Sequence, residues 1–439
     1  MAEQPKVMVG IMSEPAIGFM FAGNYRVGDT VVTGEQHAEV RDGKVVWNGN
    51  SYDSIEFVPE NEAENYFELR GVTIGVNFHW ERKENQSFRG ALRLIVENGK
   101  LTAIDIVAIE EYLLSVISSE MSATASLELL KAHAVISRSW LLAQIEKTRG
   151  LAKSEEGKYQ SCTQTDTELV KWYDREDHVN FDVCADDHCQ RYQGITREST
   201  AKVKEAIEAT WGQVLTYDGV LCDARFSKSC GGVFEEFENC WEPHHHDYLE
   251  ARRDSDKPMD FPDLTVEDNA RQWILESPEA FCNTKDAKIL SQVLNSYDQE
   301  TPDFYRWTVE YSQKELSELV KSRSGVDYGD IVDLVPLSRG TSGRIYRLKI
   351  VGTKKTMIIG KELEIRRTLS ASHLYSSAFV VEKEGNENGL PAKFVIKGAG
   401  WGHGVGLCQI GAAVMGEKGY DYKEILLHYF INSSITKLY

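Results

Sequence analysis

At residues 109–142 the chain reads IEEYLLSVISSEMSATASLELLKAHAVISRSWLL, and the period of the sequence changes here. Before this stretch, residues 6–107 alternate apolar and polar positions and carry Asn-Gly pairs at 48–49 and 98–99, which is typical of strands joined by tight turns. Within it, apolar residues recur at helical spacing from Ile109, with two acids in the first turn. A second helix is predicted over 127–147, with Ser126 as N-cap and Gly150 at its end. The sequence therefore predicts an α+β fold, a strand-rich core that carries a two-helix segment.

The length of 439 residues and the 42% hydrophobic content indicate a globular protein of several domains. We expect residues 1–254 together with 386–439 to form one domain, and residues 255–385 to form an inserted or second mixed lobe. Residues 150–182 are polar and are expected to be an irregular excursion over the surface. The elements expected after residue 255 are helices near 267–276, 286–297 and 313–322, and strands near 330–335, 343–351 and 377–383.

The formal net charge of −19, without a clustered basic run, argues against nucleic acid or an anionic membrane as partner. No apolar stretch approaches the length of a membrane-spanning helix. The first residues, MAEQPKVMVGIM, lack the charged start and apolar centre of a signal peptide.

Near the end of the sequence, residues 400–412 read GWGHGVGLCQIGA. A backbone this dense in glycine can approach a ligand closely, and it carries Trp401, His403 and Gln409, which can contact a polar substrate. The segment is therefore interpreted as the wall of a binding site.

Three blocks carry a resemblance to a known family: the stretch 109–142, then FSKSCGG at 226–232, and then residues 400–412. Two further segments, HVNFDVCADDHCQRYQG at 178–194 and SGRIYRLKIVG at 342–352, are similar to the same family. The chain resembles the stage II sporulation protein D (SpoIID/LytB domain) family, which includes the amidase enhancers of autolysins. The resemblance covers most of the chain and implies an exported protein of the cell envelope, whose leader is not in this sequence.

Glu120 ends the first predicted helix, with Val116 and Ile117 one turn back. A carboxylic acid at a helix end against apolar neighbours can have a raised pKa, as a general acid needs, although the same spacing describes a solvated glutamate. The resemblance identifies Glu120 with the catalytic glutamate of the family. No second carboxylate is tied to it by a motif, although Glu110, Glu111 and Glu235 are available.

The activity implied is therefore that of a peptidoglycan lytic transglycosylase. Such an enzyme cleaves the bond between N-acetylmuramic acid and N-acetylglucosamine with a single glutamate as acid and base, and gives 1,6-anhydro products. Sporulation members of the family prefer glycans stripped of stem peptides. The residues expected to hold the glycan lie in two loops and are Phe226, Ser227, Ser229, Gly231, Gly232, Trp401, His403, Gly404 and Gln409. His133 lies among apolar helix neighbours and is expected to be a packing residue.

A candidate metal site falls within twelve residues and consists of His178, Cys184, His188 and Cys189. Two thiolates and two imidazoles suit tetrahedral zinc, but the spacing equally allows a Cys184–Cys189 disulfide in an exported protein. Some sporulation members of the family bind zinc in this block. A zinc with four protein ligands has no open position for water, so the metal would be structural.

Cys230 and Cys408 stand where the family usually has small or hydroxyl residues. Both belong to motifs that should meet at one site, so we expect the two sulfurs to be close. They form either a disulfide or two buried thiols. A pairing of Cys240 with Cys282 is a further possibility.

Two other classes of function compete with the enzyme. The first is a non-catalytic, wall-binding activator of an N-acetylmuramoyl-L-alanine amidase, whose partners would be peptidoglycan and an amidase or another wall hydrolase. The second is a cytoplasmic metal-dependent regulator.

Overall fold

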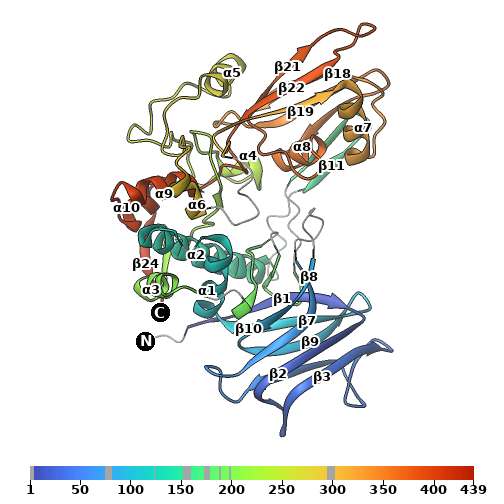
Figure 1. Cartoon of the computed structure of the whole chain (residues 1–439), viewed down its shortest axis with the longest axis vertical. Helices are drawn as coiled ribbons and strands as arrows, with labels where there is room; N and C mark the ends of the chain where they lie inside the picture. The colour runs from blue at the N-terminus through green and yellow to red at the C-terminus, as the bar shows by residue number, and fades with distance from the viewer. Residues whose placement is uncertain are drawn as a thin grey trace.

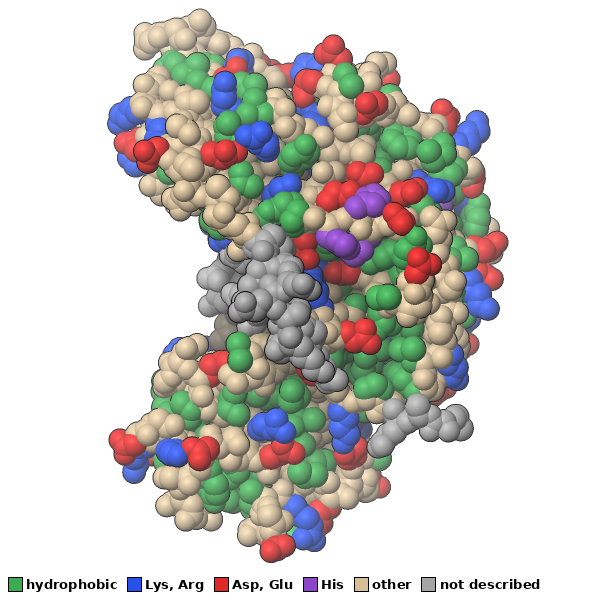
Figure 2. All heavy atoms as spheres, turned by 180° about the vertical axis from the view of Figure 1, so that it is seen from behind, with side chains coloured by type: hydrophobic (Ala, Val, Ile, Leu, Met, Phe, Trp, Pro, Cys, Tyr) green, Lys and Arg blue, Asp and Glu red, His purple; other side chains and the backbone are tan. Residues whose placement is uncertain are grey.

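The computed structural model describes residues 4–74, 82–122, 124–151, 160–172, 178–186, 189–196, 199–293 and 302–439, without the side chains of 149–151. It has the predicted α+β fold, with a strand-rich body at the bottom of Figure 1, helices above it, and an upper lobe of strands and helices. Seen from behind, the surface is hollowed between the upper lobe and the strand-rich body (Figure 2).

The strand-rich body is one sheet with the order β13-β1-β10-β9-β6-β2-β3-β4-β5, to which β7 and β8 are attached beside β2. Its strands are β1 (Lys6–Glu14), β2 (Ala16–Val27), β3 (Thr30–Arg41), β4 (Lys44–Trp47), β5 (Asn50–Tyr52), β6 (Ser54–Pro59), β7 (Tyr66–Ile74), β8 (Arg82–Phe88), β9 (Ala91–Glu97), β10 (Lys100–Ala108) and β13 (Val183–Cys184). The Asn-Gly turns are confirmed, because Asn98 and Gly99 join β9 to β10 with φ values of 51° and 76°. The short β13 lies parallel to β1, with Cys184 opposite Gly10.

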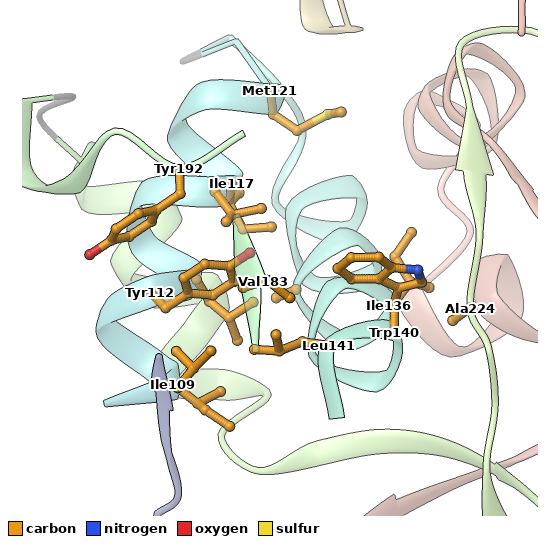
Figure 3. Close-up of a cluster of buried hydrophobic side chains, with 14 of the residues drawn as sticks. Ile109, Tyr112, Ile117, Met121, Ile136, Trp140, Leu141, Val183, Tyr192 and Ala224 are labelled. Carbon is orange, nitrogen blue, oxygen red and sulfur yellow. The ribbon is translucent and has the colours of Figure 1, made fainter. Parts of the chain in front are cut away.

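The two predicted helices are confirmed as α1 (Ile109–Glu120) and α2 (Leu127–Leu151). The Ser126 hydroxyl accepts a hydrogen bond from the Leu129 amide at 3.3 Å, as an N-cap does, whereas α2 runs past the predicted end at Gly150. Figure 3 shows α1 and α2 packed through buried side chains that include Ile117 and Leu141.

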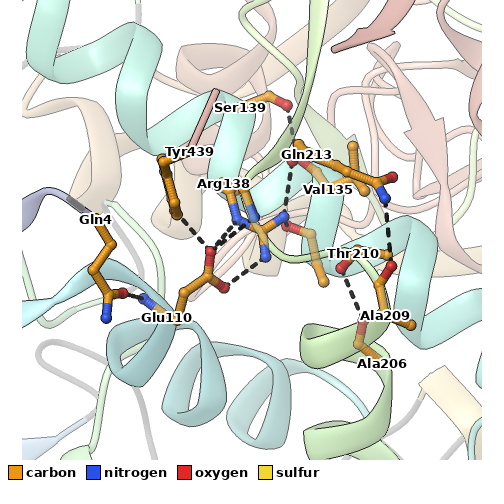
Figure 4. A network of polar contacts seen from close by, with 12 residues as sticks. Gln4, Glu110, Val135, Arg138, Ser139, Ala206, Ala209, Thr210, Gln213 and Tyr439 are labelled. Atoms are coloured by element: carbon orange, nitrogen blue, oxygen red, sulfur yellow. Dashed lines mark hydrogen bonds and ion pairs between the residues drawn. The ribbon is translucent and has the colours of Figure 1, made fainter. Parts of the chain in front are cut away.

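An ion pair fixes α1 to α2 inside this core (Figure 4). The Arg138 guanidinium donates to both Glu110 oxygens, at 2.9 and 2.7 Å, and neither side chain is more than 4% exposed. The Gly212 amide and the Tyr439 hydroxyl also donate to Glu110. Glu110 therefore holds α1, α2 and the C-terminal residue together.

The remaining elements around the helices pack on α2, except that α6 packs on α9 and β24 pairs with β14. They are α3 (Ala201–Ala209), β14 (Gln213–Tyr217), β15 (Val220–Leu221), α6 (Ala287–Val293), α9 (Gln409–Glu417), α10 (Tyr422–Tyr429) and β24 (Ser434–Lys437). Antiparallel pairing of β14 with β24 brings the C-terminus beside α3 (Figure 1). Among the described helices, none is both long and apolar enough to cross a membrane.

The upper lobe contains two sheets and its own hydrophobic core. One sheet has the order β11-β12-β20-β19-β18 and the other β17-β22-β21. The strands are β11 (Cys162–Gln164), β12 (Glu168–Lys171), β17 (Arg306–Ser312), β18 (Ile331–Arg339), β19 (Ile345–Gly352), β20 (Thr356–Gly360), β21 (Phe379–Glu384) and β22 (Lys393–Ala399), and the helices include α5 (Glu267–Glu276), α7 (Gln313–Ser324) and α8 (Glu362–Thr368).

Most elements predicted after residue 255 are present, although α6 covers only 287–293 of its predicted range and residues 294–297 lie outside the described residues. The prediction of an irregular stretch over 150–182 is wrong at β11 and β12, because β12 pairs with β20 and Leu169 packs on the core of the upper lobe. The division of the chain at residues 254 and 386 stays a prediction. In that division β22 belongs to the first domain, although both of its sheet neighbours belong to the second.

Candidate active site

Two segments far apart in the sequence meet above α2 and form what we call the paired loops, residues 226–232 and 400–409. Strand β16 (Phe226–Ser227) pairs in parallel with β23 (Leu407–Cys408). Ser229 and Trp401 exchange two backbone hydrogen bonds, at 3.1 and 2.8 Å. The expectation that the two motifs meet at one site is therefore confirmed.

Close backbone contact explains the glycines of the second loop. At Gly406, with φ of 73°, a Cβ atom would lie 2.2 Å from the carbonyl oxygen of Arg225. At Gly402, with φ of 95°, it would lie 3.0 Å from Cβ of Ser227. Only glycine allows both the left-handed backbone and this close approach.

A buried arginine from the upper lobe binds both loops. Arg344 precedes β19 and is 1% exposed. Its guanidinium donates to the carbonyl oxygens of Cys230 at 3.0 Å, Gly402 at 3.1 Å and Ser229 at 3.5 Å. The sequence analysis missed this residue, since nothing in the segment 342–352 distinguishes a buried arginine from a surface one.

Glu235, a possible second acid, has a positioning role instead. Its carboxylate is 1% exposed and accepts hydrogen bonds from the amides and hydroxyls of Thr341 and Ser342, between 2.5 and 3.2 Å. Its own amide donates to the Gly404 carbonyl at 2.9 Å. Glu235 thus holds the turn before Arg344 against the second loop.

Glu120 lies half-buried at the end of α1, where the helix gives way to extended backbone at Met121. The end of α6 connects this point to the first loop. The Ser122 amide donates to the Gln292 carbonyl at 3.1 Å, and the Lys228 ammonium donates to the Val293 carbonyl at 2.6 Å. The residues that follow Glu120 and the first of the paired loops therefore both bond to the end of α6.

His133 packs beneath the paired loops, as predicted, and is fully buried. Its ring meets Phe226 edge-on, with 4.7 Å between ring centres, and its Nε2 lies 3.1 Å from the side-chain amide nitrogen of Gln409. Burial, with the charge of Lys228, lowers the pKa of His133 to about 3, so the imidazole is neutral. Gln409 is 2% exposed, which places it behind the loop surface.

Trp401 and His403 are half-buried. Trp401 lies against Phe304 and Tyr375, with ring centres 4.7 and 4.4 Å away. His403 Nδ1 accepts a hydrogen bond from the Val405 amide at 3.0 Å. Burial, followed by the charges of nearby arginines, lowers the pKa of His403 well below its usual value, so this ring is neutral as well.

The other predicted contact residues of the loops differ in exposure. Phe226 is half-buried, whereas Ser227, Ser229, Gly231, Gly232 and Gly404 are buried. Within the described part of the chain, the hydroxyl oxygens of Ser227 and Ser229 have no hydrogen-bond partner. Such groups usually find a partner in protein, water or ligand.

The predicted metal loop, which contains His178, Cys184 and Cys189, lies beside β1 and α1. His178, Cys184 and Cys189 each offer a ligand atom within 4.8 Å of the others, and Cys189 Sγ is 3.5 Å from His178 Nε2. The fourth predicted ligand, His188, lies outside the described residues. The Phe181 ring stacks on His178. Residue 10 is glycine, which leaves room for this ring, because a Cβ atom at Gly10 would lie 2.6 Å from it.

Tyr112 lies within electrostatic range of both this loop and the end of α1. Its hydroxyl is buried, and burial raises its pKa well above the usual value. The charges of Cys189, Cys184 and Glu120 raise it further.

None of the eight cysteines, all of which lie in the described residues, forms a disulfide in the structure. The expected proximity of Cys230 and Cys408 is confirmed, because the Cys230 amide donates to Cys408 Sγ at 3.2 Å. Cys282 joins these two, with its Sγ 3.5 Å from that of Cys230. Cys240 instead has its thiol directed to the His403 carbonyl at 3.7 Å. Cys230, Cys282 and Cys408 form, together with Asp254, a buried group that could hold a metal.

Comparison with known proteins finds two family models that match parts of the chain. Residues 97–217 match the family model described as stage II sporulation protein, and residues 235–406 match a domain of unknown function, DUF8618. The first match contains Glu120 and the metal loop, and the second contains Arg344 and the start of the second loop.

Named relatives cover most of the chain. The amidase enhancer of Bacillus subtilis (strain 168) is 25% identical over 73% of this chain and 40% of its own length. The stage II sporulation protein D of Bacillus amyloliquefaciens is 22% identical, and that of Bacillus subtilis (strain 168) is 20% identical, each over 76% of both chains. The chain thus spans less than half of the amidase enhancer. The matched domain and these relatives support the SpoIID/LytB family: the chain carries its domain over residues 97–217 and is similar over most of its length to stage II sporulation protein D and to an amidase enhancer.

Proposed function

We propose that this protein is a peptidoglycan lytic transglycosylase with Glu120 as its only acid and base. The carboxylic acid of Glu120 donates a proton to the oxygen between N-acetylmuramic acid and N-acetylglucosamine as that bond breaks. The resulting carboxylate accepts the proton of the C6 hydroxyl while that oxygen attacks C1. The product is a 1,6-anhydro sugar end, and no water is consumed.

The different environments of the acids carry this proposal. Glu110 and Glu235 are buried and fully engaged in holding the fold, and Glu111 is exposed. Glu120 is half-buried at a helix end, and Ser122, two residues later, bonds to Gln292 of α6, whose next residue Val293 bonds to Lys228 of the first loop. A two-carboxylate mechanism needs a second acid across the bond, and Glu110 and Glu235 are instead occupied in holding the fold.

The paired loops would hold the glycan. Phe226 and Trp401 are half-buried and can pack on sugar rings. His403 is neutral and can contact a sugar without adding charge. Gln409, which is buried, supports the loop through His133.

We further propose that zinc binds to His178, Cys184, His188 and Cys189 and orders the metal loop. The three described ligand atoms are close enough for one ion, and thiolate with imidazole is a donor set that favours zinc. Four protein ligands leave no position for water, so the ion would support the fold beside Tyr112 and take no part in bond cleavage.

Activation of an amidase is the second candidate function, because one relative is named an amidase enhancer. Either function would place the protein outside the cytoplasm, in the cell envelope with peptidoglycan as its partner. The two differ in whether Glu120 does chemistry. Purified protein, incubated with glycan strands alone, separates them: new anhydro ends require an enzyme, whereas an activator changes the glycan only when an amidase is added.

A further inference from the structure

A second group of potential metal ligands lies in the interior, away from the metal loop. Cys230, Asp254, Cys282 and Cys408 are each at most 2% exposed. They come from four separate segments: the two paired loops, the stretch that follows the first loop, and the stretch between α5 and α6. Three cysteines and a carboxylate rarely meet in an apolar core without a reason, because a buried carboxylate is costly.

The distances in this group match those of a single tetrahedral ion. The four ligand atoms all lie within 4.8 Å of one another. Cys230 Sγ is 3.5 Å from Cys282 Sγ and 3.8 Å from Asp254 Oδ2. Tetrahedral zinc with bonds of about 2.3 Å to sulfur and 2.0 Å to oxygen places its ligands about 3.8 Å (sulfur to sulfur) and 3.5 Å (sulfur to oxygen) apart. Four donor atoms at these distances are close enough to bind one ion together.

The backbone already offers hydrogen bonds to the ligand atoms. The Cys230 amide donates to Cys408 Sγ at 3.2 Å, and the Gly232 amide donates to Cys230 Sγ at 3.4 Å. Cys408 is also the N-cap residue of α9, where the helix dipole favours a thiolate. Each of these features stabilises negative charge on sulfur, which a metal-bound thiolate carries.

Asp254 is held in the orientation that a ligand needs. Its Oδ1 accepts from the Tyr429 hydroxyl at 2.9 Å and lies 3.2 Å from His428 Nε2, while its Oδ2 faces the sulfurs. Gly411 in α9 leaves space for this carboxylate, since a Cβ there would lie 2.3 Å from Oδ2. Outer contacts of this kind fix the direction of metal-ligating carboxylates.

We propose that Cys230, Asp254, Cys282 and Cys408 bind one zinc ion in a closed, structural site. Three thiolates select a soft or borderline ion, and four protein ligands complete its coordination. The ion would join the two paired loops to each other and to the segments at 254 and 282. This site is independent of the proposed catalysis and would be present in an activator as well.

The test uses the full-length double variant Cys184→Ser with Cys189→Ser, which removes the thiolates of the metal loop. Elemental analysis of this variant is expected to find one zinc per chain. Zinc X-ray absorption should show three sulfur neighbours and one oxygen neighbour. The absence of bound metal, or a shell with fewer than three sulfurs, would overturn the proposal. A mapped disulfide among Cys230, Cys282 and Cys408 would overturn it too.

Adding Cys282→Ser to the double variant should abolish the remaining stoichiometric zinc. Cys222→Ser is the matched control, because Cys222 is also fully buried but lies outside the group, and it should retain one zinc. If the Cys282 variant does not fold, cobalt(II) in the double variant decides. Tetrahedral thiolate absorption supports the site, and its absence refutes it.

Discussion

Replacing Arg344 by methionine tests whether the upper lobe holds the paired loops. The guanidinium donates to the carbonyl oxygens of Ser229, Cys230 and Gly402, and Arg344 is 1% exposed. Methionine fills much of the same volume but donates no hydrogen bond. The three loop carbonyls would then be left without this donor in a buried setting.

The expected loss follows from these contacts. A buried polar group that loses its partner costs about 1–3 kcal/mol, and part of this is recovered when the loops relax. We therefore expect Arg344→Met to lower the free energy of unfolding by about 3–5 kcal/mol. Glycan cleavage should fall as well, because the loops that hold the substrate separate.

Arg347→Met is the matched control, three residues further along the chain in β19. Arg347 pairs with Glu168 at 2.8 Å, with side chains 40% and 31% exposed, so its loss should cost at most about 1 kcal/mol. Urea unfolding of both variants, followed by tryptophan fluorescence, measures the difference. If Arg344→Met is no less stable than Arg347→Met, the proposed role of Arg344 is wrong.

Three other predictions concern the helices and the metal loop. Arg138→Met should cost about 3–5 kcal/mol in urea unfolding, because it leaves Glu110 buried and unpaired, and a loss below about 1 kcal/mol would contradict this. The pKa of His133 is lowered from 6.5 to about 3 in the folded state. Between pH 6.5 and pH 3 this imidazole is therefore protonated in the unfolded chain but not in the folded one. The free energy of unfolding accordingly falls as the pH drops below 6.5. The slope from this residue should reach about 1.4 kcal/mol per pH unit and flatten in His133→Asn, and equal slopes for both proteins would refute the buried neutral imidazole. Cys184→Ser with Cys189→Ser should reduce bound zinc by one ion per chain, whereas unchanged zinc by elemental analysis would exclude the metal loop as a site.

Local sequence patterns predicted the elements near the site. The helical spacing from Ile109 and the cap at Ser126 are properties of neighbouring residues, and both were confirmed. The meeting of residues 226–232 with 400–409 came from a family resemblance, because no spacing within a single chain reports a contact between distant loops.

Other features depend on tertiary structure and leave no local signal. The role of Arg344 arises only from the carbonyls that surround it. Cys282 was considered as a partner of Cys240, yet folding places it beside Cys230. The strand β12 has only four residues, and it becomes a strand because β20 offers it an open edge.

The assignment of Glu120 as the only acid and base is tested most directly by mass spectrometry of glycan strands digested with purified wild-type protein and with Glu120→Gln. Glutamine keeps the size and polarity of the side chain but has no transferable proton. We predict 1,6-anhydro ends with the wild type and none with the variant, while the variant still folds and binds glycan. Anhydro ends from the pure variant, or ends formed by addition of water in the wild type, would contradict the single-glutamate mechanism.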